Sequence, residues 1–314
     1  MAELKLKTVT RTQGNNAALK DGSVTPKTFA FAFEEVDPLI AAFRRMVRGN
    51  EFDICEMAIT TYICARAHGK RFTALPIFLV RAFHHGATLH NTRAGITRPK
   101  DLEGRKVGVN RGYTVTTGVW ARGVLQDEHG VDLGRITWVL SGDEHVAEYR
   151  PPANVVPIEK DRKMGDMLAS GELAAAIGVE AESPDVKPLI PNALEAGLAA
   201  LRMRGHYPIN HLIVVRDELL AAHPDLAADV FNAFAEAKRR YVERLKAGRI
   251  DKPAAVDDVH RRVMDITGDP LPYGIAPNRR VLDELIGHAL TQKIIAQPVN
   301  VDELFWPSTR GLVA

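Results

Sequence analysis

Cysteine, excess charge of one sign and long apolar runs are all scarce in this sequence. Its 314 residues include two cysteines, Cys55 and Cys64, too few for a disulfide framework or a zinc site, so both are predicted to be buried thiols. The 41 basic and 39 acidic residues leave a formal charge of +2, too little for a nucleic-acid-binding surface in a chain of this length. No stretch approaches the roughly 20 apolar residues of a membrane span. Neither nucleic acid nor a membrane is therefore an expected partner.

Several catalytic motifs are also missing. The sequence has no HExxH, no CxxC, no glycine-rich nucleotide loop and no GxSxG. The N-terminus lacks an apolar run of signal-peptide length, which favours a cytoplasmic location or removal of a signal. The apolar content of 46% and the charged content of 25% are typical of a globular protein, and the length exceeds what one hydrophobic core usually supports.

The pattern of elements predicts a two-lobed α/β fold. Three strand–helix repeats in the first eighty residues favour a mainly parallel sheet covered by helices on both faces. We expect lobe I to comprise residues 1–92 and 206–314, and lobe II residues 93–205. Because ligands bind at the carboxyl ends of the strands in such folds, a ligand cleft is expected between the lobes.

The stretch Gly95–Gly123 has the pattern of an anion site. A short buried strand around Val107–Val109 runs into a glycine turn and then a helix, whose first backbone N–H groups have no partner within the helix. Arg111 lies in this turn and Tyr113 and Thr114 are expected to open the helix, so they add a guanidinium and hydroxyl groups. We interpret it as a cradle for a carboxylate or phosphate. A capped helix with a solvated arginine is the alternative.

Two segments resemble type 2 periplasmic-binding-protein folds: Ile96–Val109, similar to P-x-D-L-x-G-K-x-V-G, and Met167–Ile177, similar to L-x-x-G-x-x-D-A-A. The aspartate of the second pattern is an alanine here, which puts its polar contact in doubt. Shorter motifs along nearly the whole chain resemble the 4,5-dihydroxyphthalate decarboxylase family: Phe33–Glu35, Cys55–Met57, Arg81–Gly86, Asn110–Tyr113, Tyr207–His211, Pro272–Gly274 and Glu303–Phe305.

The second resemblance implies an enzyme of aromatic acid catabolism, in phthalate degradation. Such a carboxy-lyase removes one carboxylate from 4,5-dihydroxyphthalate, or a similar hydroxylated aromatic acid, and leaves protocatechuate. The implied fold is that of a binding protein without an export signal. The expected partner is a small aromatic carboxylate. The oligomeric state, including a homo-oligomer, stays open.

This chemistry requires cations for the carboxylates, a base for the phenol proton and an acid that reaches the ring carbon. Guanidinium groups match carboxylates with two hydrogen bonds, so Arg81 and Arg111 are the predicted clamps, with Arg11 as a third. Each could instead form a surface ion pair. Asn210, in the segment Tyr207–His211, is a further candidate for substrate binding.

Imidazole and carboxyl groups are the predicted acids and bases. His84 and His85 follow the third strand, where side chains of an extended segment face opposite sides, so only one of them is expected to reach the cleft. His211 approaches from the return segment. Glu56 and Glu180 end apolar strands, where burial would raise a carboxyl pKa. Structural roles for these histidines and salt bridges for these carboxylates remain open.

No cofactor is required by the spacing of these residues. His84, His85, His211 and Glu56 could gather a divalent metal, but nothing in their arrangement demands one. Two other functions stay open: a solute-binding protein of an ABC-type transporter, or a sensor derived from one, for a small aromatic or anionic ligand, and a biosynthetic relative that handles pyrimidine or menaquinone precursors.

Overall fold

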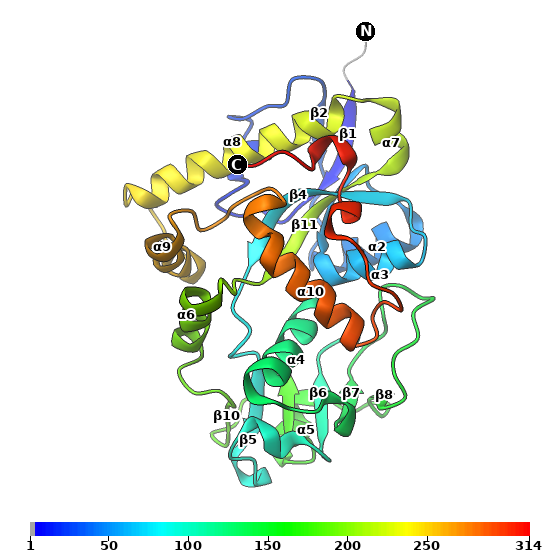
Figure 1. Ribbon diagram of the computed structural model, residues 1–314, viewed down its shortest axis with the longest axis vertical. Coiled ribbons are helices and arrows are strands. Elements are labelled where there is room, and N and C mark those ends of the chain that lie inside the picture. Colours follow the sequence, from blue (N-terminus) through cyan, green and yellow to red (C-terminus); the bar gives the residue numbers. More distant parts are fainter. Residues whose placement is uncertain (1–3) are drawn as a thin grey trace. The chain divides into compact units, whose positions relative to one another are not determined.

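The computed structural model describes residues 4–314 and divides into two compact units (Figure 1). Unit 1 comprises the chain up to Arg81, Ile209–Asp283 and Val299–Ala314, and unit 2 comprises Ala82–Pro208 and Glu284–Pro298. These units differ from the predicted lobes in residues 82–92, 206–208 and 284–298. The last difference arises because one C-terminal helix begins in unit 1 and continues into unit 2, which its apolar pattern does not reveal.

Unit 1 is built on a five-stranded sheet in the order β2-β1-β3-β11-β4. Its strands are β1 (Lys5–Val9), β2 (Ala30–Phe33), β3 (Ile54–Ala58), β4 (Phe72–Arg81) and β11 (Ile209–Arg216). β1 is parallel to β2 and β3, whereas β11 is antiparallel to both β3 and β4. The four strands from the first eighty residues therefore share one direction, as predicted, and β11, which returns from unit 2, runs between β3 and β4 in the opposite direction.

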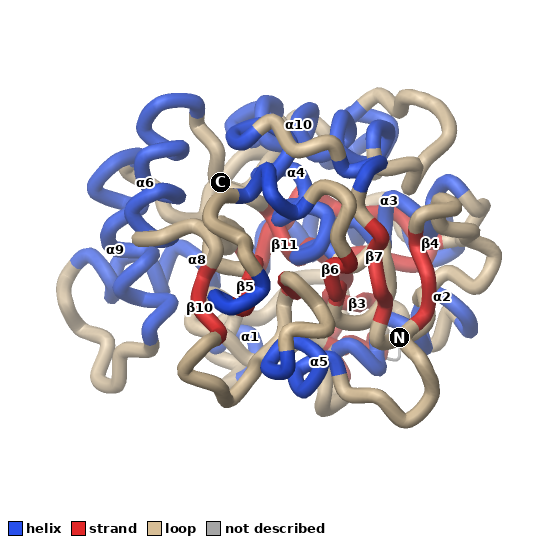
Figure 2. The backbone as a smooth tube through the Cα atoms, turned by 90° about the horizontal axis from the view of Figure 1, so that it is seen from below, coloured by secondary structure: helices blue, strands red, loops and turns tan. Residues whose placement is uncertain are grey.

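Unit 2 contains a six-stranded sheet in the order β10-β5-β9-β6-β7-β8. β6 is parallel to β7 and β9, and Figure 2 shows β6 beside β7. β5 and β10 form an antiparallel edge. The strands are β5 (Thr88–Asn91), β6 (Lys106–Val109), β7 (Thr137–Leu140), β8 (Val155–Pro157), β9 (Ala175–Ile177) and β10 (Val186–Pro188).

Helices accompany both sheets. Those of unit 1 are α1 (Ala17–Lys20), α2 (Ile40–Gly49), α3 (Ile59–Ala67), α7 (Asp217–Ala222), α8 (Leu226–Lys246) and α9 (Ala255–Thr267), and those of unit 2 are α4 (Thr116–His129), α5 (Met164–Ser170) and α6 (Ala193–Arg204). The helix that belongs to both units is α10 (Arg279–Thr291). Short 3-10 helices span Thr92–Ala94, Pro99–Leu102, Leu133–Arg135, Ala276–Asn278, Val301–Leu304 and Pro307–Thr309.

The apolar side chains explain where these elements pack. Every residue of β3 is buried, as a central strand with both faces covered requires. On α8 one face is apolar, and Val230, Phe234 and Leu245 are at most 2% exposed, as their helical spacing indicates. Met164, Met167 and Leu168 of α5 pack with Val139 and Ala176 in unit 2. No helix between residues 4 and 314 has both the length and the apolar character of a membrane span.

A buried carboxylate holds the chain in place before β2. Asp229, 8% exposed in the first turn of α8, accepts hydrogen bonds from the backbone nitrogens of Lys27 (2.8 Å) and Thr28 (2.7 Å) and from the Thr28 hydroxyl (2.8 Å). Such bonds to an ionised group are worth more than neutral ones, and their loss leaves buried donors unpaired.

Asp229→Ala is therefore expected to lower the free energy of unfolding by about 2–4 kcal/mol. Urea unfolding at neutral pH measures this loss. Asp265→Ala is the matched control, because Asp265 is an exposed aspartate on α9, and its effect should stay within about 0.5 kcal/mol. Equal losses in the two variants would contradict the role of the Asp229 hydrogen bonds.

Candidate active site

Predicted site residues from four remote segments of unit 1 meet at one edge of its sheet. His211, near the start of β11, pairs with Ala58 at the end of β3 and with Val80 near the end of β4. Arg81 is the last residue of β4, and Arg11 follows the end of β1 by two residues. This is the edge at which α/β folds commonly bind ligands.

Glu56 and His211 form a hydrogen-bonded pair at this edge. His211 Nδ1 lies 2.7 Å from Glu56 Oε1, and Glu56 Oε2 accepts from the backbone nitrogen of Arg11 at 2.9 Å. The Glu56 side chain is fully buried, whereas that of His211 is 19% exposed. Because a carboxylate can only accept, Nδ1 carries the hydrogen and the lone pair of the neutral ring lies on Nε2. The pair can therefore present an oriented base to a ligand.

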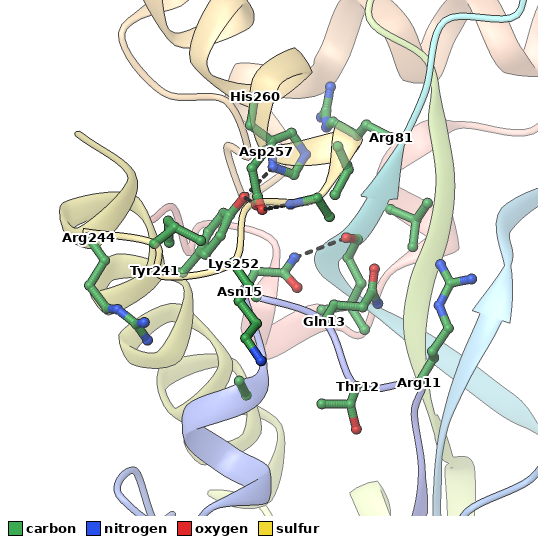
Figure 3. Close-up of a pocket in the computed structure, with 17 residues that line it drawn as sticks. Arg11, Thr12, Gln13, Asn15, Arg81, Tyr241, Arg244, Lys252, Asp257 and His260 are labelled. Carbon is green, nitrogen blue, oxygen red and sulfur yellow. Dashed lines mark hydrogen bonds between the residues drawn. The ribbon is translucent and has the colours of Figure 1, made fainter. Parts of the chain in front are cut away.

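A cavity of about 550 Å³ lies within unit 1 beside this edge (Figure 3). Its walls come from the loop after β1, the end of β4, helix α8 and the segment that leads into α9. The lining includes four cationic side chains, Arg11, Arg81, Arg244 and Lys252, and one carboxylate, Asp257. This excess of positive charge suits an anionic ligand.

Arg81 is the buried cation of the cavity. It is 5% exposed, and its NH2 group donates to Asn278 Oδ1. Asn278 in turn donates to the carbonyl oxygens of Pro272 (2.9 Å) and Gly274 (2.8 Å). These bonds tie the end of β4 to the turn before α10. The Arg81 guanidinium is consequently held in a defined position, unlike the exposed Arg11.

Three further lining residues, absent from the predicted site, form a hydrogen-bonded network. The Tyr241 hydroxyl donates to Asp257 Oδ1 at 2.5 Å and lies 2.7 Å from His260 Nδ1. Since its single hydrogen goes to the carboxylate, His260 donates from Nδ1 and keeps an acceptor on Nε2. Burial lowers the pKa of His260 to about 4, with Arg81 acting in the same direction and Asp257 opposing it.

The sequence does contain a signal for helix α9, which carries Asp257 and His260 of this network. Val256, His260 and Val263 recur at helical spacing, and Gly268 follows the helix, which is a recognisable end signal. The structure also explains the glycine at position 14, because a Cβ atom there would collide with the ring of Tyr241. The loop after β1 can therefore pass over α8 only with glycine at this position.

His84 and His85 lie in unit 2, where both side chains are buried, 4% and 0% exposed. Both follow the end of β4, where the backbone turns and Ala87 N donates to the His84 carbonyl at 3.0 Å. His85 Nε2 faces Glu128 Oε2 of α4 at 3.0 Å. A catalytic role for either histidine stays a prediction.

The predicted cradle in unit 2 holds a carboxylate of the chain itself. Glu144 accepts hydrogen bonds from the backbone nitrogens of Tyr113 and Thr114, the latter at 3.2 Å, and from the Thr114 hydroxyl at 2.6 Å. The helix consequently begins at Thr116 rather than at Tyr113. Arg111 is exposed, with φ of 71°, and its backbone nitrogen donates to Ser141 Oγ at 2.7 Å. Substrate binding by these residues stays a prediction.

The predicted site residues thus belong to two groups. Arg11, Glu56, Arg81, Asn210 and His211 are in unit 1, where Asn210 is 7% exposed on β11. The group in unit 2 comprises His84, His85, Arg111, Tyr113, Thr114 and the exposed Glu180 after β9. The predicted ligand cleft between the lobes, and any metal shared by His84, His85, His211 and Glu56, stay predictions.

Solved structures define the class of fold. The desulfurization enzyme DszB covers 98% of this chain and 97% of its own, at 14% identity and a TM-score of 0.54. The periplasmic aliphatic sulphonate-binding protein SsuA of Escherichia coli covers 97% of this chain and 92% of its own, at 12% identity and a TM-score of 0.51. The protein therefore has the two-lobed α/β fold of type 2 periplasmic binding proteins, as predicted.

Comparison with known sequences points to a narrower group of proteins than the fold does. This chain is 28% identical to the 4,5-dihydroxyphthalate decarboxylase of Comamonas testosteroni over 326 aligned residues, which cover 98% of each protein. It is 35% identical to the protein of that name from Pseudomonas putida over 149 residues, 45% of this chain and 57% of that protein. No family profile matches the chain. The resemblance to 4,5-dihydroxyphthalate decarboxylases along nearly the whole chain is confirmed.

The buried His260 makes stability depend on pH. Its folded-state pKa of about 4 lies below the ordinary 6.5, so the unfolded chain binds more protons between these values and stability falls as the pH drops through this window. Between pH 7 and pH 4.5 the loss due to His260 is expected to be about 2–3 kcal/mol.

Urea unfolding of His260→Gln at the two pH values tests this loss, which should be absent from the variant. His223→Gln, at an exposed position after α7, is the control and should retain the wild-type dependence. An unchanged dependence in His260→Gln would contradict the assignment.

Proposed function

We propose that this protein is a carboxy-lyase that decarboxylates 4,5-dihydroxyphthalate or a similar hydroxylated aromatic diacid. One observation carries the proposal: the hydrogen bond from the Arg11 backbone to Glu56 joins the Glu56–His211 pair to an arginine-lined cavity, in a chain similar over 98% of its length to a decarboxylase of that name. A cytoplasmic location and a role in phthalate catabolism accompany the proposal.

The cavity charge supports binding of a diacid. Arg81 is rigidly held by Asn278 and can clamp one carboxylate through two hydrogen bonds. Arg11 is exposed at the cavity wall and can contact the second. Because Asp257 is engaged by Tyr241 and by the backbone nitrogen of Ala254, at 2.5 and 2.7 Å, its charge is compensated and does not repel the ligand directly.

The proton steps follow from the chemistry of the ring. His211 Nε2 takes the proton of the hydroxyl para to the departing carboxylate, and the phenolate pushes electrons into the ring. The ring carbon that bears the carboxylate accepts a proton from water, and the carbon–carbon bond then breaks with its electron pair returning to the ring. The phenolate that re-forms takes its proton back from His211, which restores the neutral base. The products are CO2 and protocatechuate, with one proton consumed for each carboxylate lost. Glu56 stabilises the imidazolium that forms on His211.

Incubation of the purified protein with 4,5-dihydroxyphthalate tests the activity. Protocatechuate and CO2 are expected in equal amounts, measured by chromatography and by trapping of labelled CO2. Treatment with a chelator is expected to leave the rate unchanged, because the proposed steps use protein side chains alone. Binding of the diacid without release of CO2 would contradict the proposal and favour a solute-binding function.

His211→Gln is expected to reduce kcat by about 10²–10⁴-fold while the affinity for the diacid changes little, because the variant lacks the base but keeps both arginines. Glu56→Gln, which removes the carboxylate but keeps an acceptor for Nδ1, is expected to have a smaller effect. Steady-state kinetics and calorimetric binding measure both quantities. His223→Gln serves as the control, and equal rates in H211Q and H223Q would exclude His211 as the base.

A further inference from the structure

A second cluster of ionisable side chains lies in unit 2, apart from the groups used above. Asp127 of α4 and Glu284 and His288 of α10 bring their side-chain ligand atoms within 4.8 Å of one another. Glu284 and His288 are one helical turn apart, so both project from the same face of α10. All three residues belong to unit 2.

His288 points into this cluster without a hydrogen bond there. Its side chain is 6% exposed, and its Nε2 atom lies 3.8 Å from both Asp127 Oδ2 and Glu284 Oε1. These distances exceed the length of a hydrogen bond. They are close to the separation of about 3.4 Å between two donors that bind one zinc ion tetrahedrally at about 2.1 Å.

Two neighbouring features keep the ligand atoms in place. A Cβ atom at position 123 would collide with His288 Nε2, so the His288 ring packs closely against α4 at Gly123, and only glycine permits this approach. The buried Trp120 contacts the rings of His206 and His288 edge-on, each with a centroid distance of 5.5 Å. The His288 ring is therefore restricted in orientation before any ligand binds.

Glu284 has the outer partners that metal-binding carboxylates usually have. Its Oε1 atom accepts from Arg204 NH1 and from His206 Nδ1, both at 2.9 Å. Such contacts orient a ligand and tune its affinity for metal.

The charge balance of the cluster also fits a dication. Glu128 accepts from Arg204 and lies next to Asp127 in α4. With Asp127 and Glu284 it makes three carboxylates against the one guanidinium of Arg204, which leaves two negative charges when the imidazoles are neutral, as metal binding requires. Asp127 has a side chain 48% exposed and provides access from solvent.

We infer that Asp127, Glu284 and His288 form a binding site for a divalent transition-metal ion of the zinc class, with solvent completing the coordination. The site shares no residue with the Glu56–His211 pair or its cavity, so the inference does not depend on the proposed function.

Isothermal titration of the chelator-treated full-length protein with Zn²⁺ tests the site. One ion per chain is expected to bind, and Asp127→Asn and His288→Gln are each expected to weaken this binding by at least about 10-fold. Asp127 is exposed, so the first variant keeps the test valid if the second does not fold. Asp166→Asn, at an exposed position of α5, is the matched control and should bind like the wild type.

Absence of Zn²⁺ uptake by the wild-type chain would overturn the inference. Wild-type affinity in Asp127→Asn would overturn it equally, because the ion would then bind elsewhere. Neither result bears on decarboxylation, which is measured separately.

Discussion

The hydrogen bonds of the buried Glu56 carboxylate are the interaction on which the candidate site depends. A carboxylate with no exposure is stable only when its oxygens are paired, and here one oxygen binds His211 and the other binds the backbone of Arg11. These bonds connect the loop after β1 to two central strands. They orient the imidazole and hold the loop that forms one wall of the cavity.

Arg11 and Arg81, two of the three arginines that line the cavity, differ in their physical setting. Arg81 is buried and held by Asn278, so it loses little conformational freedom when a carboxylate binds. Arg11 is exposed, so it is accessible to an arriving anion but must be ordered on binding. In the proposed function, these two cations would bind the two carboxylates of the diacid.

The turn before α4 shows that unpaired backbone N–H groups select an anionic partner. Free N–H groups at a helix N-terminus favour a carboxylate whatever molecule supplies it, and in this protein Glu144 supplies it. The anion-binding character of this turn was therefore predictable from its glycine and strand–turn–helix pattern. The occupant was not, because Glu144 is thirty residues away along the chain from Thr114.

A local pattern predicted the short strand β6, because the apolar residues around Val107–Val109 are followed by a glycine turn and a helix. Helix α9 was missed although Val256 and Val263 have helical spacing, and with it Tyr241, Asp257 and His260 were missed as parts of the cavity wall. Charge and hydrogen-bonding capacity alone did not distinguish His260 from the other histidines.

The sequence by itself determined the fold class, the resemblance to the decarboxylases and the residue types that the proposed chemistry needs, since these depend on local spacing and on short motifs. Only the tertiary structure decided which side chains meet: His211 with Glu56, Arg81 with Asn278, and His288 with Glu284 and Asp127. The physical reason is that partners in such contacts are chosen by strand register and helix packing, which join residues far apart along the chain and leave no periodic trace in it.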